Sequence, residues 1–162
     1  MMVCKVGLHH IDDVSPLIAK FRVTLKGYKG IQAAENIAAA REEFTECIEA
    51  GFPIYASFNE EKCIGFLVCR VASCVVWVES LFVLESSRRK GVATALYVEA
   101  ENLAQSLGEE TLYNYVHPNN DRMIAFLAKR GYTVLNLMEI RKPYEGEQLS
   151  ECIPVRNNVF DY

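Results

Sequence analysis

An almost uninterrupted apolar run from Cys74 to Leu84 limits what this chain can fold into. Only Glu79 and Ser80 interrupt it, so both faces of the segment are largely apolar. A strand of this kind is typical of the middle of a sheet that is covered on both sides. A polar loop follows at once, and then the helical pattern of Val92–Leu107. The sequence therefore predicts an α/β fold in which a central strand leads through a loop into a helix.

Hydrophobic periodicity predicts the remaining elements. Helical spacing covers three further stretches, 12–25, 31–50 and 120–130, and the first of them has Asp12 and Asp13 as caps. Residues typical of strands cover the ranges 2–8, 54–58, 63–71, 111–116 and 132–140. The order of these elements predicts a mixed sheet with helices on both faces, and not a plain doubly wound fold.

The length of the chain predicts a single domain. Its 162 residues are enough to bury a core without disulfides or metals. We expect one domain over residues 1–162, with residues 143–162 as a C-terminal extension. The extension contains apolar residues that suit docking against the body of the protein or against a second subunit, namely Ile153, Val155, Val159 and Phe160.

Charge and hydropathy argue against two classes of partner. The formal net charge is −4 and no basic run is interleaved with aromatic residues, so nucleic acid is not an expected partner. No apolar segment approaches the roughly 18 residues that cross a bilayer. Near the N-terminus, polar residues occupy the positions where a signal peptide is apolar: His9, His10, Asp12 and Asp13. We therefore expect no membrane contact and a cytoplasmic protein.

The six cysteines do not form a metal or disulfide pattern. None pair as C-x-x-C, and no histidine lies at zinc-finger spacing. Three of them lie in apolar, strand-like stretches, where cysteine usually behaves as a small hydrophobic residue. We expect reduced, buried thiols and no metal.

The loop between the central strand and the next helix has the composition of an anion site. The start of a helix presents free backbone amides, and its dipole favours negative charge. Gly91 and Ala93 leave room for a phosphate close to the backbone, and Arg88, Arg89 and Lys90 surround it with positive charge. The alternative is a solvated basic turn, which leaves the order of elements unexplained.

Two stretches of this sequence resemble a known family. The motif Arg88-x-x-Gly91-x-Ala93 follows a strand whose last residues are 79–83. It resembles the coenzyme A signature of the GNAT superfamily of acyl-CoA N-acyltransferases. A downstream stretch resembles the asparagine, the apolar helix and the closing Gly-aromatic pair of that superfamily. Its matching residues, together with the hairpin glycine Gly65, are Asn120, Met123, Ile124, Phe126, Gly131 and Tyr132.

The resemblance implies a fold and a reaction. The fold is the GNAT-like one, with a central, mostly antiparallel sheet and helices on both faces. The co-substrate is acetyl-CoA, the acceptor is a small-molecule or peptide amine, and similar proteins are frequently homodimers. The resemblance also implies the residues that bind coenzyme A: Leu81, Phe82, Val83, Arg88, Arg89, Lys90, Gly91, Val92, Ala93, Thr94 and Asn120.

Each of these residues has an implied role. The amides from Arg89 to Thr94 hold the pyrophosphate. The backbone of Leu81 and Val83 pairs with the pantetheine arm as an added strand does. The side chain of Asn120 contacts the same arm.

The resemblance also places a catalytic carboxylate at Glu79. An amine attacks a thioester only as the free base, and desolvation beside Trp77 and Leu81 makes Glu79 a better proton acceptor. The alternative is a carboxylate that is satisfied by a neighbouring backbone group or arginine. With no defensible nucleophilic triad and no electropositive setting for a cysteine, direct transfer in a ternary complex is favoured over an acyl-enzyme.

The usual general acid of the superfamily is absent from its position. Where a tyrosine often protonates the leaving thiolate, this sequence has Leu127. The thiolate can leave unaided or take a proton from water, and Tyr132, Tyr113 or Tyr115 can reach the site from elsewhere. The missing tyrosine keeps a second function open, which is a non-catalytic acyl-CoA-binding or sensing module of the same fold.

Overall fold

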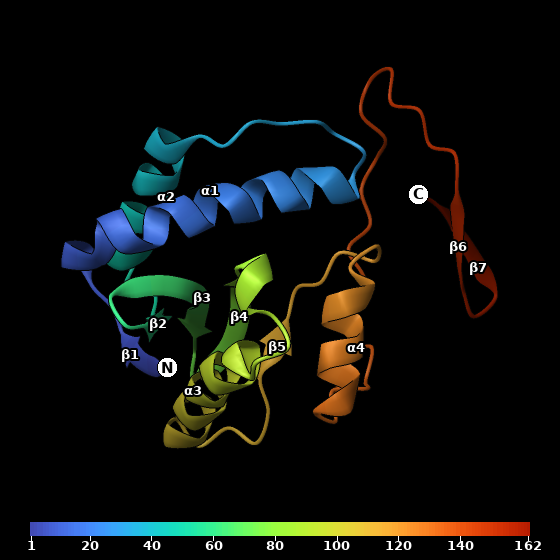
Figure 1. Cartoon of the computed structure of the whole chain (residues 1–162). Helices are drawn as coiled ribbons and strands as arrows, with labels where there is room; N and C mark the ends of the chain where they lie inside the picture. The colour runs from blue at the N-terminus through green and yellow to red at the C-terminus, as the bar shows by residue number, and fades with distance from the viewer. The chain divides into compact units, whose positions relative to one another are not determined.

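The computed structural model describes residues 1–162, which form two compact units, Met1–Phe126 and Leu127–Tyr162 (Figure 1). The first unit holds the main sheet and the second holds a small hairpin. No helix is both long enough and apolar enough to cross a membrane. The expectation of one domain with an extension from residue 143 stays a prediction.

The first unit is built on a five-stranded sheet in the order β1-β2-β3-β4-β5. All neighbouring strands are antiparallel except β4 and β5, which are parallel. The predicted central strand is β4, which lies between β3 and β5. The strands are β1 (Met2–Lys5), β2 (Ile54–Asn59), β3 (Lys62–Ala72), β4 (Val75–Val83) and β5 (Tyr113–Asn114).

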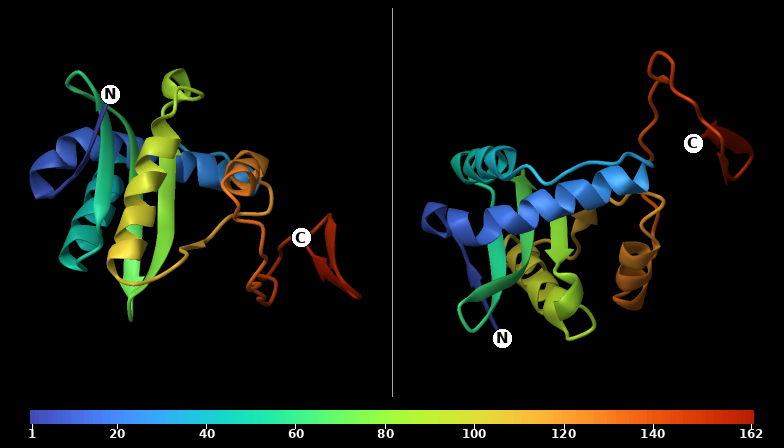
Figure 2. Two further views of the ribbon diagram at one scale, coloured as in Figure 1. Left: turned by 90° about the horizontal axis from the view of Figure 1, so that it is seen from below. Right: turned by 45° about the horizontal axis from the view of Figure 1, so that its top comes forward.

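Helices cover both faces of this sheet (Figures 1 and 2). Helices α1 (Ile11–Tyr28) and α2 (Ile37–Glu49) lie on one face, and α3 (Val92–Ser106) lies on the other. Short 3-10 turns, η1 (Leu8–His10) and η2 (Glu85–Ser87), precede α1 and α3, and α4 (Asp121–Lys129) follows β5. The predicted α/β fold, with a mostly antiparallel sheet and helices on both faces, is confirmed.

Two apolar layers hold the helices to the sheet. On the side of α1, the rings of Phe21, Phe66 and Phe82 meet with centroids 6.0 to 6.4 Å apart. On the side of α3, Leu96 and Tyr97 are fully buried. The central strand therefore contributes to packing on both faces, as its composition predicts.

Gly65 of β3 permits α3 to approach the sheet closely. A Cβ at this position would lie 3.0 Å from the carbonyl oxygen of Phe82, 3.1 Å from Val92 Cγ1 and 3.2 Å from Leu96 Cδ1. Such distances are shorter than ordinary packing contacts. Glycine at this position therefore permits α3 to lie close to β3.

The predicted last strand over 132–140 is wrong, because these residues form no strand. Val134, Leu135 and Leu137 are 86%, 72% and 73% exposed. A strand needs a neighbouring strand to accept its backbone hydrogen bonds, and apolar periodicity does not specify that neighbour. The composition of the segment is strand-like, but no strand pairs with it.

Several predicted boundaries also shift. Helix α2 starts at Ile37 and not at residue 31, because the side chain of Asn36 accepts a hydrogen bond from Ala39 N and caps the helix there. Asp12 and Asp13 lie in the first turn of α1, and its cap residue is His10. The predicted strand over 111–116 is reduced to β5.

The second unit contains a hairpin that the sequence did not predict. Strands β6 (Cys152–Val155) and β7 (Asn158–Asp161) pair antiparallel across a turn in which Arg156 has a φ of 55°. Arg141 and Glu147 form a two-bonded ion pair in the segment before it.

The expectation of buried thiols holds for only part of the set. All six cysteines are free, yet only Cys63 and Cys69 are buried, and Cys74 and Cys152 are exposed. Burial raises the pKa of Cys63 to about 11 and that of Cys69 to about 12.

Candidate functional site

The loop before α3 leaves a row of backbone amides without acceptors in the protein. The first hydrogen bond into the helix runs from Ala95 N to Gly91 O, at 2.9 Å. The amides from Arg89 to Thr94 donate to no protein group. Such amides at a helix start, together with its dipole, form a concentrated donor site for an anion.

Two residues in left-handed conformation shape this loop. Gly91, the N-cap of α3, has a φ of 81°, and Arg89 has a φ of 61°. Glycine adopts this conformation without the clash that a Cβ causes. The glycine of the predicted motif is thus required by the backbone turn that aims the amides.

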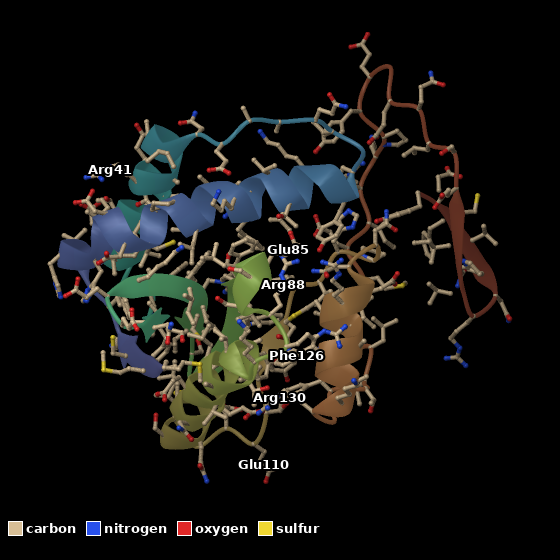
Figure 3. The ribbon with its side chains drawn as sticks, viewed as in Figure 1. Arg41, Glu85, Arg88, Glu110, Phe126 and Arg130 are labelled. Atoms are coloured by element: carbon tan, nitrogen blue, oxygen red, sulfur yellow. The ribbon has the colours of Figure 1, made fainter.

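The basic side chains of the loop differ in what they contact. The Nε of Arg88 donates to the carbonyl oxygen of Val83 at 3.1 Å, and its Nη1 lies 3.6 Å from Glu85 (Figure 3). The ammonium of Lys90 donates to Ser86 O at 2.9 Å. Arg88 and Lys90 therefore brace the loop, whereas Arg89 is exposed and makes no contact of this kind.

Strands β4 and β5 separate in the middle of β4, before the strand reaches the loop. They pair only at Trp77 with Tyr113 and at Val78 with Asn114. Beyond those two pairs, β4 continues to Val83 with β3 on one side and no strand on the other. We call the point of separation the fork.

The backbone of β4 past the fork points partly to its open side. Leu84 N donates to Ile64 O at 2.9 Å, so Leu84 faces β3. Because the facing direction alternates along an antiparallel strand, Val83 and Leu81 direct their amide and carbonyl groups away from β3. These are the two residues for which the sequence predicts pairing with an extended ligand.

A bulge places Glu79 at the fork. Val68 pairs with Ser80 and Cys69 pairs with Val78, so Glu79 is the additional residue on β4. Its carboxylate accepts a hydrogen bond of 2.5 Å from Arg70 Nε. This hydrogen bond and the charge of Glu79 raise the pKa of Arg70. The carboxylate is therefore paired with an arginine, which was the alternative stated above.

Aromatic rings surround this ion pair. Trp77 lies 4.7 Å from Tyr113 and 4.9 Å from Tyr115 between ring centroids, and the second pair is stacked. The guanidinium of Arg70 lies 5.4 Å from the centre of the Trp77 ring, and its Nη2 donates to the Tyr115 hydroxyl at 3.4 Å. Arg70 thus contacts three side chains at the fork, from β4 and from the residue after β5.

Asn120 ties the start of α4 to the end of α1. Its side-chain oxygen accepts from Tyr28 OH at 3.1 Å and from Met123 N at 3.2 Å. The ring of Tyr28 stacks on His117 at 5.8 Å. Burial and the charge of Lys29 lower the pKa of His117. The Nδ1 of His117 accepts a hydrogen bond from Asn119 N, which stabilises the turn before α4. Asn120 is thus well placed as a cap, in addition to any ligand contact.

An open groove of about 1390 Å³ lies beside the loop on the side of α1. Its lining includes Phe82, Leu84 and Arg88, which belong to the end of β4 and to the loop. Carboxylates outnumber basic groups around it: Asp12, Asp13, Glu35, Glu60, Glu61 and Glu85 face Lys20, Lys62 and Arg88.

The structure places the predicted strand residues Leu81, Phe82 and Val83 on β4 past the fork, and the predicted loop residues 88–94 at the start of α3. Sequence reasoning missed Arg70, although a single arginine at the end of the apolar run 63–71 is a visible signal. Leu127, at the position of the usual tyrosine, is buried in α4.

Comparisons with known proteins agree with this architecture. The profile of the acetyltransferase (GNAT) family matches residues 25–132. No curated protein matches the chain.

Three solved structures share the fold at low sequence identity, which establishes the fold alone. AAC(6')-Iy in complex with the bisubstrate analogue CoA-S-monomethyl-acetylneamine has a TM-score of 0.64 and 19% identity, over 88% of this chain and 98% of that one. The aminoglycoside antibiotic 6'-N-acetyltransferase AAC(6')-IG from Acinetobacter haemolyticus has a TM-score of 0.63 and 15% identity, over 91% and 100%. PaiA N-acetyltransferase from Thermoplasma acidophilum, in complex with coenzyme A, has a TM-score of 0.65 and 20% identity, over 80% and 87%.

Proposed function

We propose, because the chain belongs to the GNAT acetyltransferase family, that it transfers an acetyl group from acetyl-CoA to a primary amine. The observation that carries the proposal is the row of free amides from Arg89 to Thr94 at the start of α3. Two of the structures that share its fold contain coenzyme A or an analogue that includes it. The proposed reaction is direct attack in a ternary complex.

The residues of this chain fit the co-substrate in three places. The amides from Arg89 to Thr94 hold the pyrophosphate, with Arg89 supplying an exposed positive charge. The outward backbone groups of Leu81 and the outward amide of Val83, whose carbonyl oxygen accepts from Arg88, pair with the pantetheine arm. The Nδ2 of Asn120 supplies the contact to the same arm, since the oxygen of that side chain already accepts from Tyr28 and Met123. Phe82, Lys90, Gly91, Val92 and Ala93 shape the loop around these contacts.

The chemical step needs proton transfers as well as binding. The neutral amine nitrogen attacks the thioester carbonyl carbon, the new N–C bond forms and the C–S bond breaks. Glu79 accepts the proton that the nitrogen loses, directly or through water. The departing thiolate gains a proton and leaves as the free thiol. We assign to Glu79 this base role, with Arg70 as its partner in the ground state.

The acceptor is proposed to be a small cationic amine. Two of the proteins with this fold are named for aminoglycosides or bound to an analogue of one. The groove beside the loop has more carboxylates than basic groups, which suits a polyamine-like acceptor. We further propose that the protein acts in the cytoplasm and as a homodimer, without nucleic acid or membrane as partners, because the net charge is −4 and the 143–162 segment is apolar in part.

A second candidate function is acyl-CoA binding without transfer. Two observations favour it. The carboxylate of Glu79, the expected base, is already paired with Arg70, and a leucine occupies position 127, where the usual acid would be a tyrosine. The two functions share the loop and differ only in turnover.

Three measurements test these proposals. Calorimetric titration with coenzyme A is expected to show saturable binding, and no binding at millimolar ligand would refute both functions. Release of free thiol from acetyl-CoA in the presence of a panel of amines is expected for the transferase. Saturable binding without amine-dependent thiol release would leave the binding module. Light scattering with an inline column gives the oligomeric state.

A further inference from the structure

We propose that Arg70 positions Glu79 and Tyr115 at the fork, and that Tyr115 donates the proton that the leaving thiolate takes. This inference rests on the proposed transferase function and names the acid that the leucine at position 127 cannot supply. Arg70 is a positioning residue in this scheme. Tyr115 and Glu79 are the groups that exchange protons with the reacting atoms.

The location of the two groups follows from the topology of the sheet. Val78 and Asn114 form the last pair between β4 and β5. The next residue on each side is Glu79 and Tyr115. The two residues that follow the last strand pair are therefore a carboxylic acid and a phenol, one on each side of the gap between the strands.

Arg70 joins these two residues with one guanidinium group. Its Nε donates to Glu79 Oε1 at 2.5 Å and its Nη2 donates to Tyr115 OH at 3.4 Å. Because Arg70 donates to the phenol oxygen, the phenolic O–H remains available as a donor to a ligand. A planar guanidinium with its donors in fixed directions sets the relative position of two acceptors, which an ammonium cannot do.

Packing holds this arrangement in place. Trp77 stacks on Tyr115 with an interplanar angle of 15°, and Arg70 lies over the same indole. The negative face of the indole attracts the guanidinium, which favours this position of Arg70. Side chains confined by stacking lose less entropy when a substrate binds, so the fork is preorganised for proton transfer.

The charged groups that face the fork from the neighbouring elements leave Arg70 as its main cation. Arg22 of α1 and Cys47 of α2 interact weakly with Glu79, and Arg22 is itself bonded to Glu43 of α2. Cys69, which is on β3 like Arg70, also interacts with the charge of Glu79 on β4.

The protons of the reaction balance through these two residues. The amine loses one proton to the Glu79 carboxylate as its nitrogen bonds to the carbonyl carbon. The phenol of Tyr115 gives one proton to the sulfur as the C–S bond breaks. Both residues return to their starting state when Glu79 releases its proton to solvent and the Tyr115 phenolate takes one from solvent.

The first experiment removes the phenol hydroxyl. Tyr115→Phe is expected to lower kcat by about tenfold, below the usual 10²–10⁴-fold range of general acid–base catalysis because a thiolate leaves readily. Its affinity for coenzyme A is expected to stay unchanged. Tyr113→Phe is the matched control, since Tyr113 contacts the same indole and its hydroxyl makes no hydrogen bond to the protein. It should retain the kcat of the original chain.

The second experiment tests the role of Arg70 through kcat and ligand affinity. Arg70→Gln loses both directed contacts, to Glu79 and to Tyr115, so we expect it to lose most of its kcat while its affinity for coenzyme A stays unchanged. Arg70→Lys keeps the charge but lacks the planar donor geometry, so we expect it not to restore kcat.

The outcomes separate this inference from the proposed function. Equal kcat in Tyr115→Phe and Tyr113→Phe, with acetyl transfer intact in the original chain, overturns the role of Tyr115 alone. Unchanged kcat in Arg70→Gln, or full kcat in Arg70→Lys, overturns the positioning role of Arg70 and leaves a structural one. Absence of acetyl transfer by the original chain to every amine refutes the transferase and this inference with it. Coenzyme A binding by each variant shows that it has folded.

Discussion

The anion loop and the fork are both parts of the candidate site, but they are encoded in different ways. The loop is a continuous stretch, and its amides are aimed by the conformation of Gly91 and the start of α3. The fork is assembled from β3, β4 and the end of β5, and its central residue, Arg70, is far from the loop in sequence. A local site can be recognised from a motif, whereas an assembled site needs strand register.

The largest effect should come from the fork. We expect Glu79→Gln to reduce kcat by about a hundredfold or more, the low end of the range for a general base, with coenzyme A affinity unchanged. Steady-state kinetics and calorimetry measure the two quantities. Glu43→Gln is the control, because Glu43 is also paired with an arginine, Arg22, at 2.5 Å. Unchanged kcat in Glu79→Gln would contradict the base role.

The next effect should come from the loop. Gly91 and Gly108 lie at the two ends of α3, with φ of 81° and 84° and no atom close to an added Cβ. Alanine at either position costs about 1–2 kcal/mol of backbone strain. We expect only Gly91→Ala to weaken coenzyme A binding, by about tenfold, since about 1.4 kcal/mol corresponds to a factor of ten.

Thermal unfolding and calorimetry of both variants test this pair. Similar losses of stability with unequal losses of affinity would support the loop as the anion site. Equal affinity for coenzyme A in the two variants would show that the conformation of Gly91 does not aim the amides at a ligand.

The sequence predicted the loop better than the fork for a physical reason. The conformation of residues 88–94 depends on neighbours in the chain, so Gly91 and the helix start could be read directly. The contact between Arg70 and Glu79 depends on the bulge in β4, which no local pattern reveals. The same limit explains 132–140, where strand composition was correct and the partner strand was absent.

A smaller effect connects the two regions through Gly65. An added Cβ at this position lies 3.0 to 3.2 Å from Phe82 O, Val92 and Leu96, so Gly65→Ala requires these neighbours to shift by a few tenths of an ångström. We expect a loss of about 1–3 kcal/mol in the free energy of unfolding, the range for overpacking, with weaker coenzyme A binding and little change in the pH profile of kcat/KM.

Gly27→Ala is the control for that variant. Gly27 lies inside α1, and no atom would lie within 4 Å of an added Cβ. Alanine is therefore expected to stabilise the protein by up to about 1 kcal/mol. If Gly65→Ala left both stability and coenzyme A affinity intact, the close approach of α3 would not position the loop.

The smallest effect compares the two ends of β3 through their thiols. Cys63 lies toward the loop and Cys69 beside Arg70, and burial raises their pKa from the ordinary 9.0 to about 11 and about 12. Unfolded thiols ionise first, so the folded state is favoured fully below pH 9 and loses this advantage as the pH rises toward 11 and 12. Each thiol then contributes a slope of at most about 1.4 kcal/mol per pH unit.

Urea unfolding at pH 8 and at pH 10.5 measures that slope. We expect Cys69→Ala to reduce this slope by up to the contribution of one thiol. Cys74→Ala, at an exposed position, is expected to leave the slope unchanged. The same slope in Cys69→Ala as in the original chain would contradict the raised pKa of Cys69, because burial of its thiol in the folded protein is what should produce the difference.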